Sequence, residues 1–280
     1  IQLWNFGKQV PVFIEDEYIE FIGFRNTIGL DTFLYQNWKK DLLNQDYSLI
    51  TDENAYYLSI AQINEPILRY QKVSPDYTTD LPDKMQYFQY TSKINLVNTF
   101  YKPEIAQLKY SQFMSSEGFT DGLKNNFTRS VNTPFHANQG EASLFIASST
   151  TATSKQTYDV NWNGQILATD TVTYLSSNKF NAAIPISRLQ ENNNLQIKGQ
   201  ASTLLLGVSH IAIQYPRLFN MTGIDFTTIR SESTERKLIE FSQPLTTHPY
   251  LYDTKNQRVI DLDTDKKKLI IDNDAAIIYT

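Results

Sequence analysis

The chain has 280 residues, a net charge of −5 and no cysteine. Cysteine-based chemistry, disulfides included, is therefore excluded within the chain, and the 25 Lys and Arg residues are too scattered to form a basic stripe for nucleic acid. No run approaches the roughly 20 apolar residues that cross a bilayer, so we expect no membrane span. This length favours two compact units over one.

The residue composition favours β-structure, because the 17 Tyr and 16 Phe residues pack well on a pleated surface, as do Ile, Val and Thr. Residues 10–24 alternate apolar and polar around the acidic Glu15–Glu17, which predicts a hairpin. Residues 31–43 predict one or two helical turns capped by Asp31 or Thr32. The remaining expectations before residue 119 are two strands within 47–61, strands at 67–73 and 86–96, a loop at 74–84, and a short helix at 103–114.

From Phe119 onward, strand-like runs recur at short spacing, separated by Gly, Asn, Ser or Pro, and this pattern predicts a β-sandwich. Asn161-Trp162-Asn163-Gly164 gives the sharpest turn signal, since Asn-Gly readily adopts the positive φ angles of a tight hairpin. We expect Trp162 to be exposed in this turn. The predicted strands are 124–131, 141–149, 156–161, 165–175, 178–186, 194–199 and 208–215.

The last strand-like segments are too few for a sandwich of their own, so we expect them to complete a sheet begun elsewhere. They are 237–241, 250–252, 259–262, 268–271 and 275–279. The predicted class is all-β, with a jelly-roll-like β-sandwich, a second β-rich unit and few short helices. The predicted division is an N-terminal β-rich domain at 1–112, the sandwich at 113–224, and C-terminal strands at 225–280 that pack on one of these.

Several segments, taken in chain order, resemble the region that precedes the peptidase domain in gingipain-like cysteine peptidases of the type IX secretion sortase group. The collinear order carries the resemblance, because each segment alone is short. The segments are Gly7–Val12, Asp16–Gly23, Asp31–Tyr35, Tyr47–Leu58, Glu117–Phe119, Val160–Gly164, Ile184–Leu189, Ile213–Arg217 and Tyr252–Asn256.

The resemblance implies a non-catalytic N-terminal scaffold or interaction module, with the family's catalytic Cys and His in a domain that would follow residues 276–280. No position here matches those two residues, so the resemblance implies no catalytic residue and no cofactor in this chain. It also implies a secreted, periplasmic or outer-surface protein of a Bacteroidetes-type bacterium. The implied partners are the downstream peptidase domain or other surface proteins.

Two patterns in the sequence are weighed as binding sites. Asp261, Asp263 and Asp265 alternate, and Asp272 stands at the twelfth place, as in a calcium-binding loop. Lys266 occupies the sixth place, where that loop needs glycine, so a solvated hairpin turn is the favoured reading. The three histidines, His136, His210 and His248, form no local ligand pair.

Two other classes of function remain as alternatives. A carbohydrate-binding β-sandwich module of a surface protein predicts a shallow groove lined by exposed aromatic rings, with Trp162 as the candidate contact. A stand-alone enzyme predicts a deep polar cleft with a perturbed titratable group. No Gly-x-Ser-x-Gly elbow or other nucleophile pattern supports the enzyme.

Overall fold

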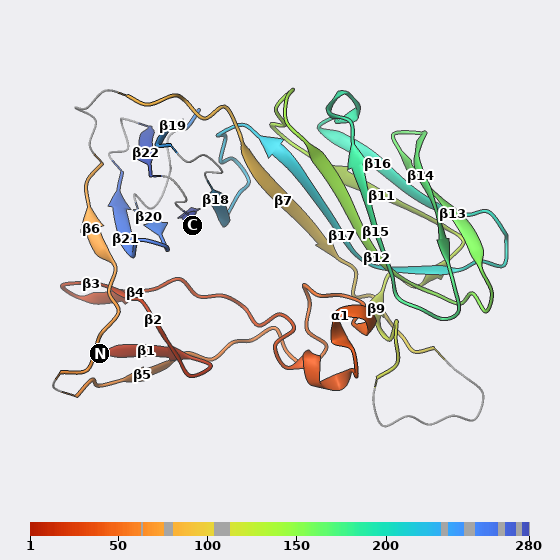
Figure 1. Cartoon of the computed structure of the whole chain (residues 1–280), viewed down its shortest axis with the longest axis horizontal. Coiled ribbons are helices and arrows are strands. Elements are labelled where there is room, and N and C mark those ends of the chain that lie inside the picture. The colour runs from red at the N-terminus through yellow and green to blue at the C-terminus, as the bar shows by residue number, and fades with distance from the viewer. Residues whose placement is uncertain are drawn as a thin grey trace. The chain divides into compact units, whose positions relative to one another are not determined.

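The structure is a computed structural model, and it describes residues 1–62, 64–75, 81–103, 113–230, 235–243, 250–262, 267–272 and 276–279. Its regular structure is mostly β-strand, which confirms the all-β class (Figure 1). The described helices are short: η1 (Asp31–Leu34), α1 (Trp38–Asp41) and η2 (Ile186–Arg188).

The contacts divide the chain into two units, and unit 1 is discontinuous. Unit 1 contains Ile1–Phe24, Asn54–Tyr90 and Arg217–Thr280, and unit 2 contains Arg25–Glu53 and Thr91–Pro216. This division differs from the contiguous 1–112, 113–224 and 225–280 expected from the sequence. The difference arises because strands far apart in the chain pair with one another, which composition and local patterning do not reveal.

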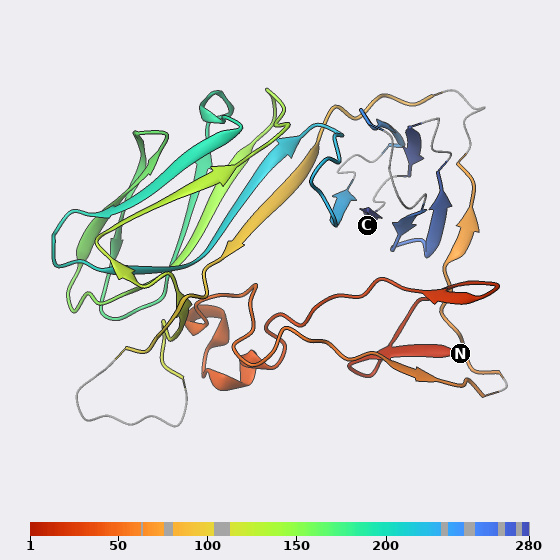
Figure 2. The ribbon, with the colours of Figure 1, turned by 180° about the vertical axis from the view of Figure 1, so that it is seen from behind.

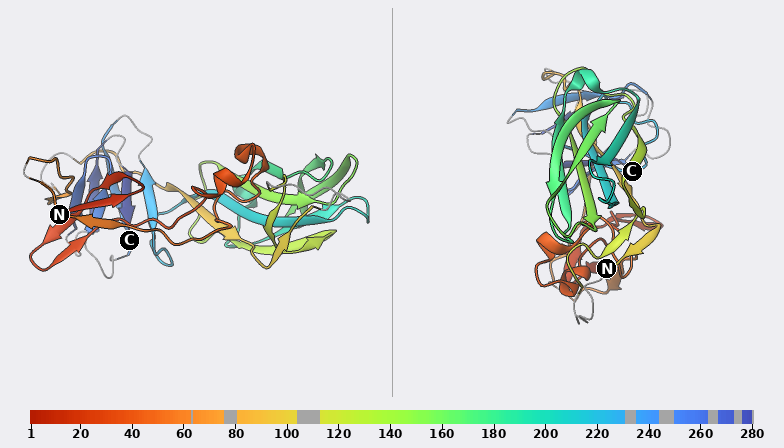
Figure 3. Two further views of the ribbon diagram at one scale, coloured as in Figure 1. Left: turned by 90° about the horizontal axis from the view of Figure 1, so that it is seen from below. Right: turned by 90° about the vertical axis from the view of Figure 1, so that its right-hand side faces the viewer.

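Unit 2 is a sandwich of two antiparallel sheets, seen from behind in Figure 2 and in two further views in Figure 3. The first sheet has the order β10 (Leu123–Lys124), β17 (Leu206–Arg217), β12 (Ala142–Thr150), β15 (Asn178–Ile184), and β7 (Phe88–Asn95) also pairs with β17. The second has the order β11 (Asn126–Asn132), β16 (Asn192–Gly199), β13 (Gln156–Trp162), β14 (Gln165–Val172). A small pair, β8 (Thr99–Tyr101) and β9 (Gly118–Thr120), lies outside both sheets. The predicted sandwich is confirmed.

Alternating burial along the strands shows where the sandwich core lies. On β13, Tyr158, Val160 and Trp162 are buried, while the residues between them are less so. The ring of Tyr158 meets that of Phe180 on β15 in the other sheet, with centroids 6.4 Å apart. Burial, and then the carboxylate of Asp170 that accepts its hydrogen bond, raise the pKa of the Tyr158 hydroxyl. Each such apolar side chain contributes about 1.5–3 kcal/mol when fully buried.

The β13–β14 hairpin is confirmed, but the predicted exposure of Trp162 is wrong. Asn163 and Gly164 form the turn, with φ angles of 52° and 78°, and Trp162 is the last residue of β13, paired with Gln165. The period of two along the strand puts its indole on the same face as Tyr158 and Val160. The indole is fully buried and its Nε1 donates to the Arg188 carbonyl at 3.2 Å.

Unit 1 is built from several smaller sheets. Its N-terminal part has a three-stranded sheet of order β2 (Lys8–Val10), β1 (Gln2–Asn5), β5 (Tyr57–Ser59), and the hairpin β3 (Phe13–Glu15), β4 (Tyr18–Glu20) that the acidic turn predicted. Its largest sheet has the order β18 (Thr227–Arg230), β23 (Ala276–Tyr279), β20 (Tyr250–Asp253), β21 (Arg258–Asp261), β6 (Gln71–Val73). A further pair is β19 (Lys237–Glu240) and β22 (Lys268–Ile271).

The final strands of the chain join β6 through one parallel ladder, in which Val259 of β21 is the partner of Lys72. In the other sheet, that of β19 and β22, Lys84 forms a parallel bridge with Leu238 of β19. An apolar core that includes Phe88, Ile239 and Leu269 fills this part of unit 1. The strands β20, β21 and β23 therefore belong to the same sheet as β6, which comes much earlier in the chain.

Some local expectations differ from the structure. Of the two strands expected within 47–61, only β5 is present. Asp31 does not cap the helical turn; its carboxylate is fully buried and accepts hydrogen bonds from the Ser48 hydroxyl at 2.9 Å and the Leu49 amide at 2.8 Å. The segment after Asp31 is thus fixed by a contact outside it. The helix expected at 103–114 falls mostly on 104–112, which lie outside the described residues.

The turn at Gly164 gives a testable prediction. A Cβ added there meets nothing within 4 Å, so Gly164→Ala introduces only the backbone cost of a left-handed residue, about 1–2 kcal/mol. We expect urea unfolding to show unit 2 destabilised by this amount. Gly29→Ala is the control, because its φ is ordinary and its nearest contact is 3.6 Å. Equal stability of both variants would contradict the positive-φ turn.

Candidate functional site

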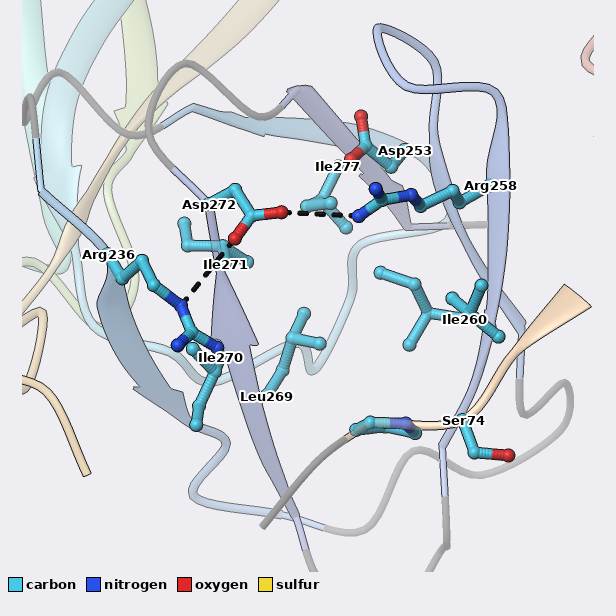
Figure 4. A pocket seen from close by; sticks show the side chains of 12 residues that line it. Ser74, Arg236, Asp253, Arg258, Ile260, Leu269, Ile270, Ile271, Asp272 and Ile277 are labelled. Atoms are coloured by element: carbon cyan, nitrogen blue, oxygen red, sulfur yellow. Dashed lines mark hydrogen bonds and ion pairs between the residues drawn. The ribbon is translucent and has the colours of Figure 1, made fainter. Parts of the chain in front are cut away.

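Unit 1 contains a pocket of about 160 Å³ beside strand β22. Strands β20, β21, β22 and β23 line it, together with the segment that ends β6. Its floor is aliphatic: Ile260, Leu269, Ile271 and Ile277 are buried members of the unit's core cluster (Figure 4). The pocket is therefore an opening onto the hydrophobic core.

The rim of the pocket is charged. Asp272 lies between two guanidinium groups, as Figure 4 shows: its Oδ2 is 3.2 Å from Arg258 Nη1 and its Oδ1 is 3.6 Å from Arg236 Nε. The three side chains are about half exposed, at 44% for Asp272, 45% for Arg258 and 52% for Arg236. Exposed pairs of this kind contribute roughly 0–1 kcal/mol, so these groups are free to exchange partners at little cost.

Asp253 also lines the pocket, but its carboxylate is committed to the β20–β21 turn. Its Oδ1 accepts from the amides of Lys255 at 3.2 Å and Asn256 at 3.1 Å, and its Oδ2 accepts from Asn256 Nδ2 at 2.6 Å. The side chain is buried. Burial, and then the nearby Asp253 charge, raise the pKa of Tyr70. Asp253 thus holds the turn that presents Arg258.

The pair β19–β22 is tied to the rest of unit 1 by a charge cluster. The carboxylate of Glu240 on β19 contacts Lys84 Nζ at 2.5 Å and Lys268 Nζ of β22 at 2.8 Å. Hydrogen bonds from Lys268 and then Lys84 lower the pKa of Glu240 to about 2. The Glu240 carboxylate therefore stays charged over the whole physiological pH range, beside the strand that borders the pocket.

Unit 2 holds a separate cluster of polar side chains around His210. Its Nδ1 is 2.7 Å from Asn95 Oδ1, and Asn95 Nδ2 donates to Asp46 at 3.1 Å. Lys93 and Arg25 pair with the same carboxylate at 2.5 and 3.1 Å. Burial alone would raise the pKa of Asp46, but hydrogen bonds from Lys93 and Asn95 hold it below its usual range. Burial lowers the pKa of His210 to about 4, so the ring is neutral.

The other sequence-predicted residues do not converge. His136 Nδ1 lies 3.0 Å from the Thr133 carbonyl, and His248 lies outside the described residues. Of the calcium candidates, Asp263 and Asp265 also lie outside them, Asp261 pairs with Lys72 at 3.3 Å, and Asp272 is the carboxylate of the pocket. Within the described ranges, no three His, Asp or Glu side chains are placed to hold a metal ion.

Sequence reasoning did not find the pocket. Arg236 and Arg258 stand in unremarkable polar surroundings, and they reach Asp272 only because three different segments meet in space. Trp162, the predicted ligand contact, is buried in unit 2 and offers no surface to a ligand. A period-two count along 158–162 would have placed its indole in the core.

The comparisons with known proteins are weak. No protein-family model and no curated protein matches the chain. Among solved structures, dimeric latent PorU from Porphyromonas gingivalis is 11% identical with a TM-score of 0.48, over 76% of this chain and 20% of that chain. This chain thus spans about a fifth of the PorU chain.

Carbohydrate-binding modules are also among the similar structures. A CBM36-1 domain of a multidomain xylanase from the hindgut metagenome of Trinervitermes trinervoides is 8% identical, with a TM-score of 0.28 over 45% of this chain and 95% of that domain. The module CBM36 in complex with calcium and xylotriose is 10% identical, with a TM-score of 0.29 over 44% of this chain and 98% of that chain. All these TM-scores are low, so we infer neither an activity nor a ligand of this chain from the likenesses.

The His210 cluster predicts a pH dependence. The pKa of His210 is about 4 in the folded state, below its ordinary 6.5, so the unfolded chain binds the proton first as the pH falls. The contribution of the neutral ring is complete above pH 6.5 and is lost as the pH falls towards 4. When the pH falls from about 7.5 to about 5, the titration of His210 should lower the free energy of unfolding of unit 2 by about 2 kcal/mol.

The measurement is urea unfolding of the wild type and of His210→Gln at both pH values. The variant keeps a side-chain donor for Asn95 and has no titrating group, so its stability should fall less over this range. Parallel pH dependences of the two proteins would contradict a buried, neutral His210.

Proposed function

We propose that this chain is a non-catalytic scaffold or interaction module of a secreted or surface protein of the gingipain-like peptidase family. The observation that carries the proposal is the pocket of unit 1, with its aliphatic floor and its Arg236–Asp272–Arg258 rim. An apolar centre edged by exchangeable charges is the arrangement by which protein surfaces bind a partner's side chain. The collinear resemblance of the sequence segments supplies the family.

A second surface of unit 1 supports contacts with proteins. Four large apolar side chains of the three-stranded N-terminal sheet and its flanks are strongly exposed: Phe6 at 65%, Tyr57 at 66%, Leu58 at 63% and Ile60 at 89%. Tyr57, Leu58 and Ile60 lie on and next to β5, an edge strand of its sheet, and Phe6 follows β1. Tyr57 and Leu58 are successive strand residues that point to opposite faces, so apolar side chains are exposed on both faces of this edge. Exposed apolar surface of this kind marks interaction sites.

The chemistry of the pocket favours a polypeptide over a sugar as its ligand. Sugars are bound mainly by aromatic faces that stack on the ring, and the described residues of the lining include no aromatic side chain. The partner we propose is the peptidase domain of the same polypeptide or another surface protein, in the periplasm or at the outer surface. A carbohydrate-binding role is the rival that the experiment below must separate.

The first test is to read the gene beyond Thr280 and to measure binding between this chain and the segment that follows. We expect a Cys/His peptidase domain there, and calorimetry should detect its binding to the 280-residue chain. A glycan array is the comparison arm. A reading frame that stops at Thr280, or a glycan ligand in the absence of binding to the domain, would contradict the proposal.

A further inference from the structure

The pocket lies along the edge of strand β22 that no other described strand pairs with, which we call the open edge. Four consecutive residues, Leu269 to Asp272, line it. Successive side chains of a strand point to opposite faces of the sheet, so a cavity that meets consecutive residues must lie beside the strand and not above it. β19 pairs with one edge of β22, and no strand within the described ranges pairs with the other.

Part of the opposite wall of the pocket comes from the border of a sheet. Val73, the last residue of β6, lines it together with Ser74 and Pro75. β6 is the outermost strand of the five-stranded sheet and pairs with β21 alone among the described strands. Arg258, Asp253 and Ile277 also line the pocket, and as cross-strand partners they share one face of this sheet. The pocket therefore lies between the edge of β22 and that face, next to the β6 border.

Unpaired N–H and C=O groups along such an edge are a template for another extended chain. A peptide beside β22 would point alternate side chains into the pocket, where Leu269, Ile271 and Ile277 offer an apolar surface of limited volume. At the rim, two guanidinium groups share the carboxylate of Asp272; among the described lining residues the other carboxylate is that of Asp253, which is held by its turn. Guanidinium groups pair well with a second carboxylate.

We propose that the open edge of β22 accepts an extended segment of a partner protein as an added β-strand. One aliphatic side chain of that segment fills the pocket, and a neighbouring acidic residue binds Arg236 and Arg258. This inference rests on the proposed function as an interaction module, and it names both the mode of binding and the chemistry of the partner.

The test uses a library of short random peptides displayed on phage, selected on the full 280-residue chain. Enriched peptides, made synthetically, should share an aliphatic residue with an acidic residue close to it. Two variants probe the site: Ser74→Trp, which narrows the gap from an exposed position, and Arg236→Ala, which removes a half-exposed rim charge. Each should weaken peptide binding, measured by fluorescence anisotropy, about tenfold or more.

Arg129→Ala is the matched control, since Arg129 is an exposed arginine of β11 in unit 2, and it should bind as the wild type does. Circular dichroism confirms that each variant is folded. A selection without enrichment, or peptides that bind Ser74→Trp and Arg236→Ala as well as the wild type, would overturn the inference. If the downstream domain binds the wild type and Ser74→Trp equally, the module function stands and strand addition fails. If peptides bind at β22 and the downstream domain does not bind the chain, strand addition stands and the proposed partner of the module fails.

Discussion

The parallel pairing of β6 with β21 is the contact on which unit 1 depends. It joins residues 71–73 to residues 258–260, which lie far apart in the sequence, so β6 and the C-terminal strands share one sheet. Such non-local pairing requires a long loop to close before any contact is gained. Unit 2 is largely formed by the chain between these two segments, and its sheets also depend on long-range pairing, such as that of β11 with β16 and of β12 with β17.

The same contact creates the candidate site. With β6 at the border of its sheet, the end of that strand and the open side of β22 enclose a pocket whose floor belongs to the core. The rim charges come from three segments: Arg236 precedes β19, Arg258 begins β21 and Asp272 follows β22. Asp253 fixes the turn before Arg258, and the ladder with β19 holds β22. The site thus depends on tertiary structure at every point.

Local patterns in the sequence predicted the local structure well. The hairpin around Glu15–Glu17, the Asn163-Gly164 turn and the strands of the sandwich follow from alternation and turn chemistry, because both act between neighbouring residues. The same patterns wrongly placed Trp162 in the turn, because the predicted strand ended at residue 161 and the strand in the structure ends at Trp162. Long-range contacts could not be predicted from local patterns. The residues around Asp31 do not indicate its contact with Ser48, and those around Asp272 do not indicate its ion pair with Arg236.

Amide hydrogen exchange along β22 tests the central claim most directly, namely that this strand has an open edge beside the pocket. In an antiparallel pair, alternate residues direct their N–H groups to the partner and the others direct theirs away. We predict alternating protection along Lys268–Ile271, with Ser143–Ser148 of β12, which pair with both β15 and β17, protected throughout. Uniform protection of β22 would contradict the account, because its second edge would then already be paired.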